Sequence, residues 1–172
     1  MKILVFLFNL TSNENASNMK HLRTKNLEQI IANIRQLLAN LHIHYQNVRN
    51  FHWNVTGPHF LALHKHLEEL YEATGHRIDE VAERLRSLGT DARQSLQEYI
   101  AMAEIEEKPQ IQDAWDMIAA VKEGNEVMLH NMEAIVKAAD EAGDIGSGDI
   151  FGTYIGELEK ENWMLSALLA KE

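Results

Sequence analysis

The feature that most constrains the fold of this chain is helical spacing of apolar residues with very few helix breakers. Four long stretches place apolar residues at intervals of three and four, the period of an amphipathic helix. Glycine or proline lies between successive stretches, and Pro58 and Pro109 are the only prolines. This pattern predicts an all-α fold with long helices at 24–55, 59–88, 111–142 and 149–170 and a short helix at 96–103.

The lengths of the connections predict how these helices are arranged. Short turns after residues 55 and 142 make two antiparallel hairpins, whereas the connection 90–109 is long enough to run the length of a bundle. A bundle with one long crossover has the ferritin-like topology. We therefore predict a ferritin-like four-helix bundle over residues 24–172, with the short helix in the long connection and an N-terminal arm of residues 1–23.

The N-terminal arm allows several interpretations. Residues 3–10 are apolar, but eight residues are too few to span a membrane. Lys2 ahead of them hints at a secretory signal, yet no clear small-x-small cleavage site follows. The sequence favours either an alternative start at Met19 or an arm that packs on the assembled protein, with the polar run 11–18 as a hinge.

Composition excludes several kinds of chemistry. The 172 residues include no cysteine, which rules out disulfides, thiolate zinc sites, iron–sulfur clusters and a cysteine nucleophile. A formal net charge of −10 opposes non-specific binding to nucleic acid or to anionic membranes. The same charge suits a protein that attracts cations, although a merely soluble acidic surface explains it equally simply.

Two histidines and two carboxylates are the candidate metal ligands. His52 lies on the apolar stripe of the first long helix, and His64 lies beside that of the second, so the intervening turn brings them together. Asp79 and Glu83 are four residues apart and share a helix face. The alternatives are satisfied core histidines and a solvated acidic face, the latter paired with Arg77 and Arg86.

The spacing of these four residues conflicts with a site inside one chain. Asp79 is 15 residues beyond His64 (79 − 64) and Glu83 is 19 beyond it (83 − 64), which is roughly 22 and 28 Å along a helix. A two-fold axis across the middle of this helix would bring the histidine end of each chain to the carboxylate end of its partner. None of the nine histidines follows a glutamate by three residues, so the Glu-x-x-His motif of di-iron bundles is absent from the sequence.

Segments around these ligands resemble the ferroxidase signature of the Dps family, the DNA-binding proteins from starved cells, also called mini-ferritins. The other three ligands follow His52 by 12, 27 and 31 residues, as in that family. The similarity covers most of residues 24–170. The segments that carry it are HWNV (52–55), GP (57–58), LH (63–64), DEVAER (79–84), EYI (98–100) and WM (163–164).

The resemblance implies an iron-storing ferroxidase. Members of the family form a hollow shell of twelve subunits, oxidise Fe(II) preferably with hydrogen peroxide at sites between two-fold-related subunits, and store ferric mineral. By position, His52 and His64 would come from one subunit and Asp79 and Glu83 from its mate, with zinc as an alternative occupant. Trp53 would lie close to the site and intercept stray oxidising equivalents, or else anchor the interface.

The resemblance also implies acidic pores for iron on three-fold axes. Asp144 and Asp149 match the pore positions near the start of the last helix, where rings of carboxylates would draw cations inward. Thr153 stands at a third position that is acidic in the family. The simpler alternative is that Asp149 caps or charges the start of a helix.

DNA binding is expected to be weak or absent, although the family name implies it. The trait usually depends on a lysine-rich tail, for which the only candidates are Lys20, Arg23 and Lys25. The alternative functions are a DNA-coating nucleoid protein with little iron chemistry and a helical adhesion or interaction protein. Salt-dependent DNA retardation would separate the first of these from an iron store. The expected location is the cytoplasm.

Overall fold

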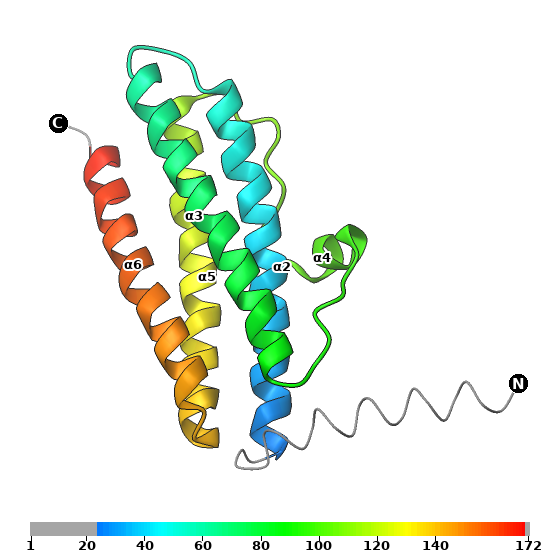
Figure 1. Cartoon of the computed structure of the whole chain (residues 1–172). Coiled ribbons are helices and arrows are strands. Elements are labelled where there is room, and N and C mark those ends of the chain that lie inside the picture. Colours follow the sequence, from blue (N-terminus) through cyan, green and yellow to red (C-terminus); the bar gives the residue numbers. More distant parts are fainter. Residues whose placement is uncertain (1–23, 171–172) are drawn as a thin grey trace, which may run out of the picture.

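The four long helices form one bundle in the computed structural model, which describes residues 24–170. The helices are α2 (Thr24–Asn54), α3 (Phe60–Ser87), α4 (Leu96–Met102), α5 (Ala114–Ala142) and α6 (Ile145–Leu169). α2 packs against α3 and α5, and α5 packs against α6. Figure 1 shows α2 and α6 running in one direction, α3 and α5 in the other, and α4 outside α2. This arrangement confirms the all-α four-helix bundle with one crossover.

Polar side chains of α2 hold the long crossover in place. The side-chain oxygen of Asn40 accepts hydrogen bonds from the backbone N–H groups of Glu104 (2.7 Å) and Ile105 (3.1 Å). About two helical turns further on, the side-chain oxygen of Asn47 accepts from the backbone N–H of Lys108 at 2.9 Å. These bonds satisfy backbone groups of an extended segment that has no strand to pair with.

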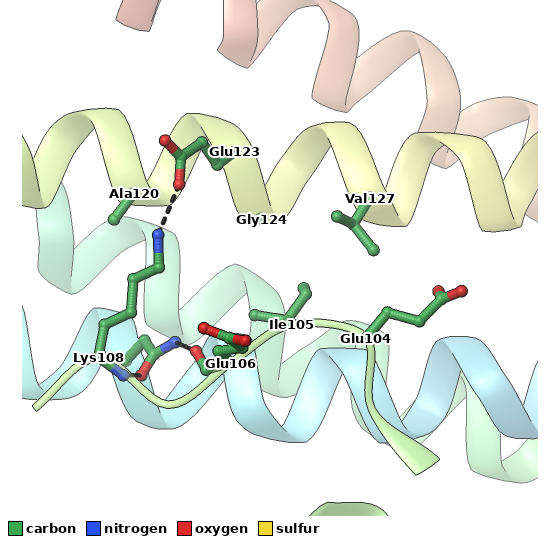
Figure 2. Close-up of a pocket in the computed structure, with 9 residues that line it drawn as sticks. Glu104, Ile105, Glu106, Lys108, Ala120, Glu123, Gly124 and Val127 are labelled. Atoms are coloured by element: carbon green, nitrogen blue, oxygen red, sulfur yellow. Dashed lines mark hydrogen bonds and ion pairs between the residues drawn. The ribbon is translucent and has the colours of Figure 1, made fainter.

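A cleft of about 200 Å³ lies between this crossover and α5 (Figure 2). Lys108 reaches across it to Glu123 of α5 at 2.5 Å. Glu104 accepts hydrogen bonds from Asn40 (3.1 Å) and Asn131 (3.0 Å). Three of the four charged side chains that line the cleft thus have partners, Glu106 being the fourth, and no residue of the predicted metal site lines it. We therefore assign the cleft to the scaffold.

The turn between the last two long helices is shorter than expected. The sequence pattern predicts a turn over 143–148 and a helix from 149, but Gly143 ends α5 with φ +73° and Asp144 already caps α6. The Asp144 carboxylate accepts the backbone N–H of Ser147 at 3.2 Å, so the helix begins at residue 145. Asp113 caps α5 in the same way, which moves its start from the expected 111 to 114.

A polar layer divides the hydrophobic core into two parts. The larger cluster surrounds the N-terminal part of α2 and the α5–α6 turn, and the smaller surrounds the α2–α3 turn. Between them lie buried polar residues from three helices: His44, Asn47, Thr74, Arg77 and Asn125. Within residues 24–170, no helix combines the length and the apolarity that crossing a membrane requires.

Gly124 is needed where α5 crosses the polar layer. A Cβ atom at this position would stand 2.3 Å from Nδ1 and 2.8 Å from Cε1 of His44, which is itself buried. We therefore expect Gly124→Ala to destabilise the protein by about 1–3 kcal/mol through overpacking. Gly152 is the matched control, since a Cβ atom added there would meet nothing within 4 Å. A thermal midpoint for Gly124→Ala equal to that of Gly152→Ala would contradict this prediction.

His44 makes stability depend on pH. Burial, and secondarily the charge of Arg77, lower the pKa of its imidazole from 6.5 to about 4. Between these values the unfolded chain binds a proton that the folded chain rejects, so stability is fully present above pH 6.5 and falls as the pH drops. At pH 5 the loss is about 2 kcal/mol. The thermal midpoint should therefore fall less between pH 7 and 5 in His44→Gln than in the wild type, and equal falls would refute this.

Polar side chains also join α3 and α6 in the half of the bundle near the α5–α6 turn. Arg77 forms an ion pair with Glu157 at 3.1 Å, and Arg84 forms one with Asp144 at 2.6 Å. The hydroxyl of Tyr154 also donates a hydrogen bond from α6 to Glu80 of α3. These contacts occupy Arg77 and Arg84, two of the three arginines of α3, and so leave fewer cations available to the carboxylates of this helix.

Candidate metal centre

His52 and His64 lock together across the α2–α3 hairpin. His52 lies in the last turn of α2 and is 7% exposed, and His64 lies in the second turn of α3 and is half-buried. Nδ1 of His52 is 2.8 Å from the backbone oxygen of His64, and Nδ1 of His64 is 2.8 Å from the backbone oxygen of His52. The sequence prediction that the hairpin brings these two residues together is therefore confirmed.

These hydrogen bonds fix the tautomer of both rings in their neutral form. A carbonyl oxygen can only accept, so each Nδ1 must carry the hydrogen and donate it. The neutral imidazole then keeps its lone pair on Nε2, the atom through which it can bind a metal. A hydrogen bond from the opposite ring nitrogen orients a histidine ligand and raises its basicity. Both imidazoles are thus prepared as Nε2 ligands.

Aromatic packing holds the two imidazoles rigid. Their rings stack with centroids 3.9 Å apart and planes at 19°. Phe60 stacks on His64 with centroids 5.1 Å apart, and Tyr71 meets His52 edge-on at 5.3 Å. Phe60 precedes His64 by one helical turn, so the sequence could have indicated this contact. The contact of Tyr71 crosses between helices, and no sequence signal singled it out.

Asp79 and Glu83 are exposed on α3, and neither has an ion-pair partner within residues 24–170. The sequence left open that these two carboxylates pair with Arg77 and Arg86. The structure shows no such pairing. Arg77 binds Glu157 instead, and Arg86 donates to the backbone oxygen of Thr90 at 2.9 Å. Two carboxylates on one helix face therefore remain without a countercharge from the described part of their own chain.

The structure does not bring the histidines and the carboxylates of one chain together. Among the described residues, no group of three or more histidine, aspartate or glutamate side chains is close enough to hold a metal ion. His64 and the two carboxylates lie towards opposite ends of the 28-residue helix α3. One chain thus offers two separate half-sites, an imidazole pair and a carboxylate pair.

Trp53 directly follows His52 near the end of α2, with 56% of its surface exposed. The guanidinium carbon of Arg49 is 4.7 Å from the centre of its ring. Leu61, just after the α2–α3 turn, is 80% exposed. Large apolar side chains near the α2–α3 turn are therefore exposed in the single chain. This exposure is compatible with either role of Trp53, as a trap for oxidising equivalents or as an anchor of a subunit interface.

The two predicted pore residues have different surroundings. Asp144 is buried, caps α6 and pairs with Arg84 at 2.6 Å. Burial raises its pKa, but the hydrogen bonds from Ser147 and the charge of Arg84 outweigh this effect and hold the pKa below its ordinary value. The carboxylate is thus ionised but neutralised by an internal partner. Asp149 is exposed and lies inside α6, so it is not the cap of this helix.

Comparison with known proteins agrees with the ferritin-like bundle. Residues 31–172 match the ferritin-like domain family. The chain is 33% identical over 112 residues to the DNA protection during starvation protein of Porphyromonas gingivalis, covering 65% of this chain and 70% of that protein. It is 33% identical over 110 residues to DNA protection during starvation protein 2 of Bacillus anthracis, covering 64% of this chain and 75% of that protein.

Solved structures give the same relationship. The Dps protein of Vibrio cholerae O1, described as a member of a broad superfamily of ferritin-like diiron-carboxylate proteins, superposes with a TM-score of 0.84 at 34% identity. The alignment covers 87% of this chain and 94% of that one. A Dps protein from Bacillus brevis gives a TM-score of 0.82 at 32% identity, covering 87% and 100%. The chain belongs to the Dps family of ferritin-like proteins.

Proposed function

We propose that this protein oxidises Fe(II), preferably with hydrogen peroxide, and stores the ferric product inside a cage of twelve copies. The observation that carries the proposal is the imidazole pair, whose Nδ1 atoms are both engaged and whose Nε2 atoms are left for a metal. The diiron-carboxylate superfamily of the Vibrio cholerae relative supports iron chemistry in general. The proposed location is the cytoplasm, a reducing compartment that supplies iron as Fe(II).

Each iron site would be shared between two copies of the chain. His52 and His64 of one copy would meet Asp79 and Glu83 of its partner across a two-fold axis, giving two equal sites per pair. The separation of these half-sites within one chain supports this arrangement. Imidazole and carboxylate together suit Fe(II), and they also suit zinc, which would compete for the site.

The proposed reaction uses both electrons of the peroxide bond. Two Fe(II) ions give one electron each to hydrogen peroxide, and two protons complete the formation of two water molecules and two Fe(III) ions. A two-electron reduction of this kind releases no hydroxyl radical. Trp53, beside the histidines, would intercept oxidising equivalents that escape this route.

Iron-dependent growth of absorbance tests this function. Protein given Fe(II) and peroxide should develop the absorbance of ferric mineral faster than with oxygen alone, in particles with the mass of twelve chains. Equal rates with both oxidants would contradict the peroxide preference, and a rate no greater than that of iron in buffer would contradict the function itself.

DNA coating is the second candidate, because the similar proteins are named for DNA protection during starvation. The net charge of −10 opposes it. The basic residues Lys20 and Arg23 lie outside the described residues. We expect the full chain to bind DNA weakly or not at all. Retardation of DNA by the full chain at about 0.15 M salt, abolished by deleting residues 1–25, would instead favour the DNA-coating function.

Asp149 is the better candidate for a pore carboxylate, since Asp144 is neutralised by Arg84. Asp149→Asn should slow uptake at limiting iron and leave the particle mass unchanged, because an exposed carboxylate draws cations without supporting the fold. Asp144→Asn should instead lower the thermal midpoint, since it weakens a buried ion pair. Uptake by Asp149→Asn at the wild-type rate would remove it from the proposed pore.

A further inference from the structure

We propose that Arg49 tunes how tightly the candidate iron site holds a divalent cation. Two aromatic rings hold its guanidinium on α2 about one helical turn before His52. There its positive charge would lower the affinity of the imidazole pair for divalent cations. This inference rests on the proposed function, since it concerns how tightly the same site holds an ion before oxidation. It assigns a role to a residue that is neither a ligand nor part of the core.

Arg49 differs from the other arginines in having no polar partner. Six arginines fall within residues 24–170, and the other five donate hydrogen bonds or form ion pairs. For Arg49, neither kind of bond is found in this part of the chain. A half-buried cation without a carboxylate is unexpected in a chain with 26 acidic and 16 basic residues.

Aromatic faces take the place of the missing carboxylate. The guanidinium carbon of Arg49 is 5.2 Å from the ring centre of Tyr45 and 4.7 Å from that of Trp53. These residues lie four positions before and four after it, so the three side chains follow one face of α2. Each contact is worth about 0.5–1 kcal/mol at an exposed site. The rings hold the charge without neutralising it.

This retained charge lies about one helical turn before His52 on α2. Arg49 precedes His52 by three residues, which places the two on neighbouring positions of the helix surface. Tyr71 links them further, since its ring contacts His52 at 5.3 Å and Tyr45 at 6.0 Å.

A cation beside the ligands opposes the binding of another cation. At a separation of about 8 Å in a solvated setting, a unit charge and a divalent ion repel by about 1 kcal/mol before screening. Salt reduces this further, leaving an effect of about two- to fivefold in affinity. The consequence is that the imidazoles alone hold an ion loosely, so the partner's carboxylates decide whether it is retained.

Zinc titration of the assembled full-length protein tests this inference, because Zn²⁺ reports binding without oxidation. Arg49→Gln removes the charge, and Arg49→Lys keeps it. Lys122→Gln, on α5 and paired with Glu126, is a control with the same change in net charge. Particle mass is measured for each variant first. Arg49→Met, which keeps an apolar stem, replaces Arg49→Gln if that variant fails to assemble.

We expect Arg49→Gln to bind Zn²⁺ about two- to fivefold more tightly than the wild type at low salt, with the difference shrinking in about 0.5 M salt. Arg49→Lys should restore the wild-type affinity, and Lys122→Gln should not differ from the wild type. An unchanged affinity for Zn²⁺ in Arg49→Gln would overturn the inference. This result is expected if a carboxylate of the partner subunit neutralises the guanidinium. An equal gain in Lys122→Gln would do the same.

Failure of the proposed function gives a different result in the same titration. If the wild type binds no more zinc than His52→Ala with His64→Ala, the site itself is absent, and the inference falls with it. If the wild type binds zinc through these histidines and Arg49→Gln binds equally well, only the role of Arg49 is refuted.

Discussion

Replacing both His52 and His64 with alanine is expected to lower peroxide-driven iron oxidation by at least about a hundredfold. The change removes both nitrogen ligands from every site at once. It also removes two partly buried hydrogen bonds between α2 and α3, so stability should fall by about 1–3 kcal/mol. Stopped-flow absorbance after mixing with Fe(II) and peroxide measures the first effect, and thermal unfolding measures the second.

The control for this variant removes two histidines that have no place in the site. The double variant His66→Ala with His76→Ala also removes two imidazoles, and both of these lie on α3. It should leave the oxidation rate within about twofold of the wild type, because neither imidazole is a proposed ligand. A normal rate in the His52 and His64 double variant, with intact particles, would refute histidine ligation.

Replacing Asp79 and Glu83 with alanine should abolish oxidation without the accompanying loss of stability. Both carboxylates are exposed and have no ion pair within residues 24–170, so the free energy of unfolding should change by less than about 0.5 kcal/mol. The oxidation rate should again fall by at least about a hundredfold, because a site without carboxylates loses its charged ligands. A lost activity with retained stability separates a ligand role from a structural one.

A neighbouring pair of carboxylates on the same helix serves as the control. Glu69 and Glu72 are exposed on α3, as Asp79 and Glu83 are. Glu69→Ala with Glu72→Ala lowers the negative charge by the same amount, and it should retain the wild-type rate. If both pairs slowed oxidation equally, general attraction of iron by an acidic surface would explain the result, and ligation by Asp79 and Glu83 would be wrong.

Helical spacing was sufficient to predict most of the fold. Apolar periodicity gave the four long helices, and the length of the 90–109 connection gave the crossover, because only a long segment can return along the bundle. The errors lay at the starts of α5 and α6. There Asp113 and Asp144 cap their helices, but periodicity does not distinguish a capping aspartate from one in a loop.

The candidate site was predicted less completely than the fold. Spacing placed His52 near His64 across a hairpin and separated both from the carboxylates. It could not predict the reciprocal hydrogen bonds, which depend on how the rings rotate against the opposite backbone. It also could not predict that Arg84 neutralises Asp144, since that contact joins residues 60 positions apart on α3 and α6.

The central proposal, that each iron site is shared between two chains, is tested most directly by mixing two inactive variants. One lacks His52 and His64, and the other lacks Asp79 and Glu83. In a mixed pair, one site combines the histidines of the second variant with the carboxylates of the first and is complete, whereas the other site has no ligands. Random pairing makes about half of the pairs mixed, with one working site of two.

Particles assembled from both variants together should therefore recover about a quarter of the wild-type oxidation rate. Particles of either variant alone, mixed only after assembly, should stay inactive and provide the control. If the ligands of a site came from one chain, no pairing could rebuild it. Co-assembled particles that contain both variants in equal amounts and remain inactive would contradict the shared site.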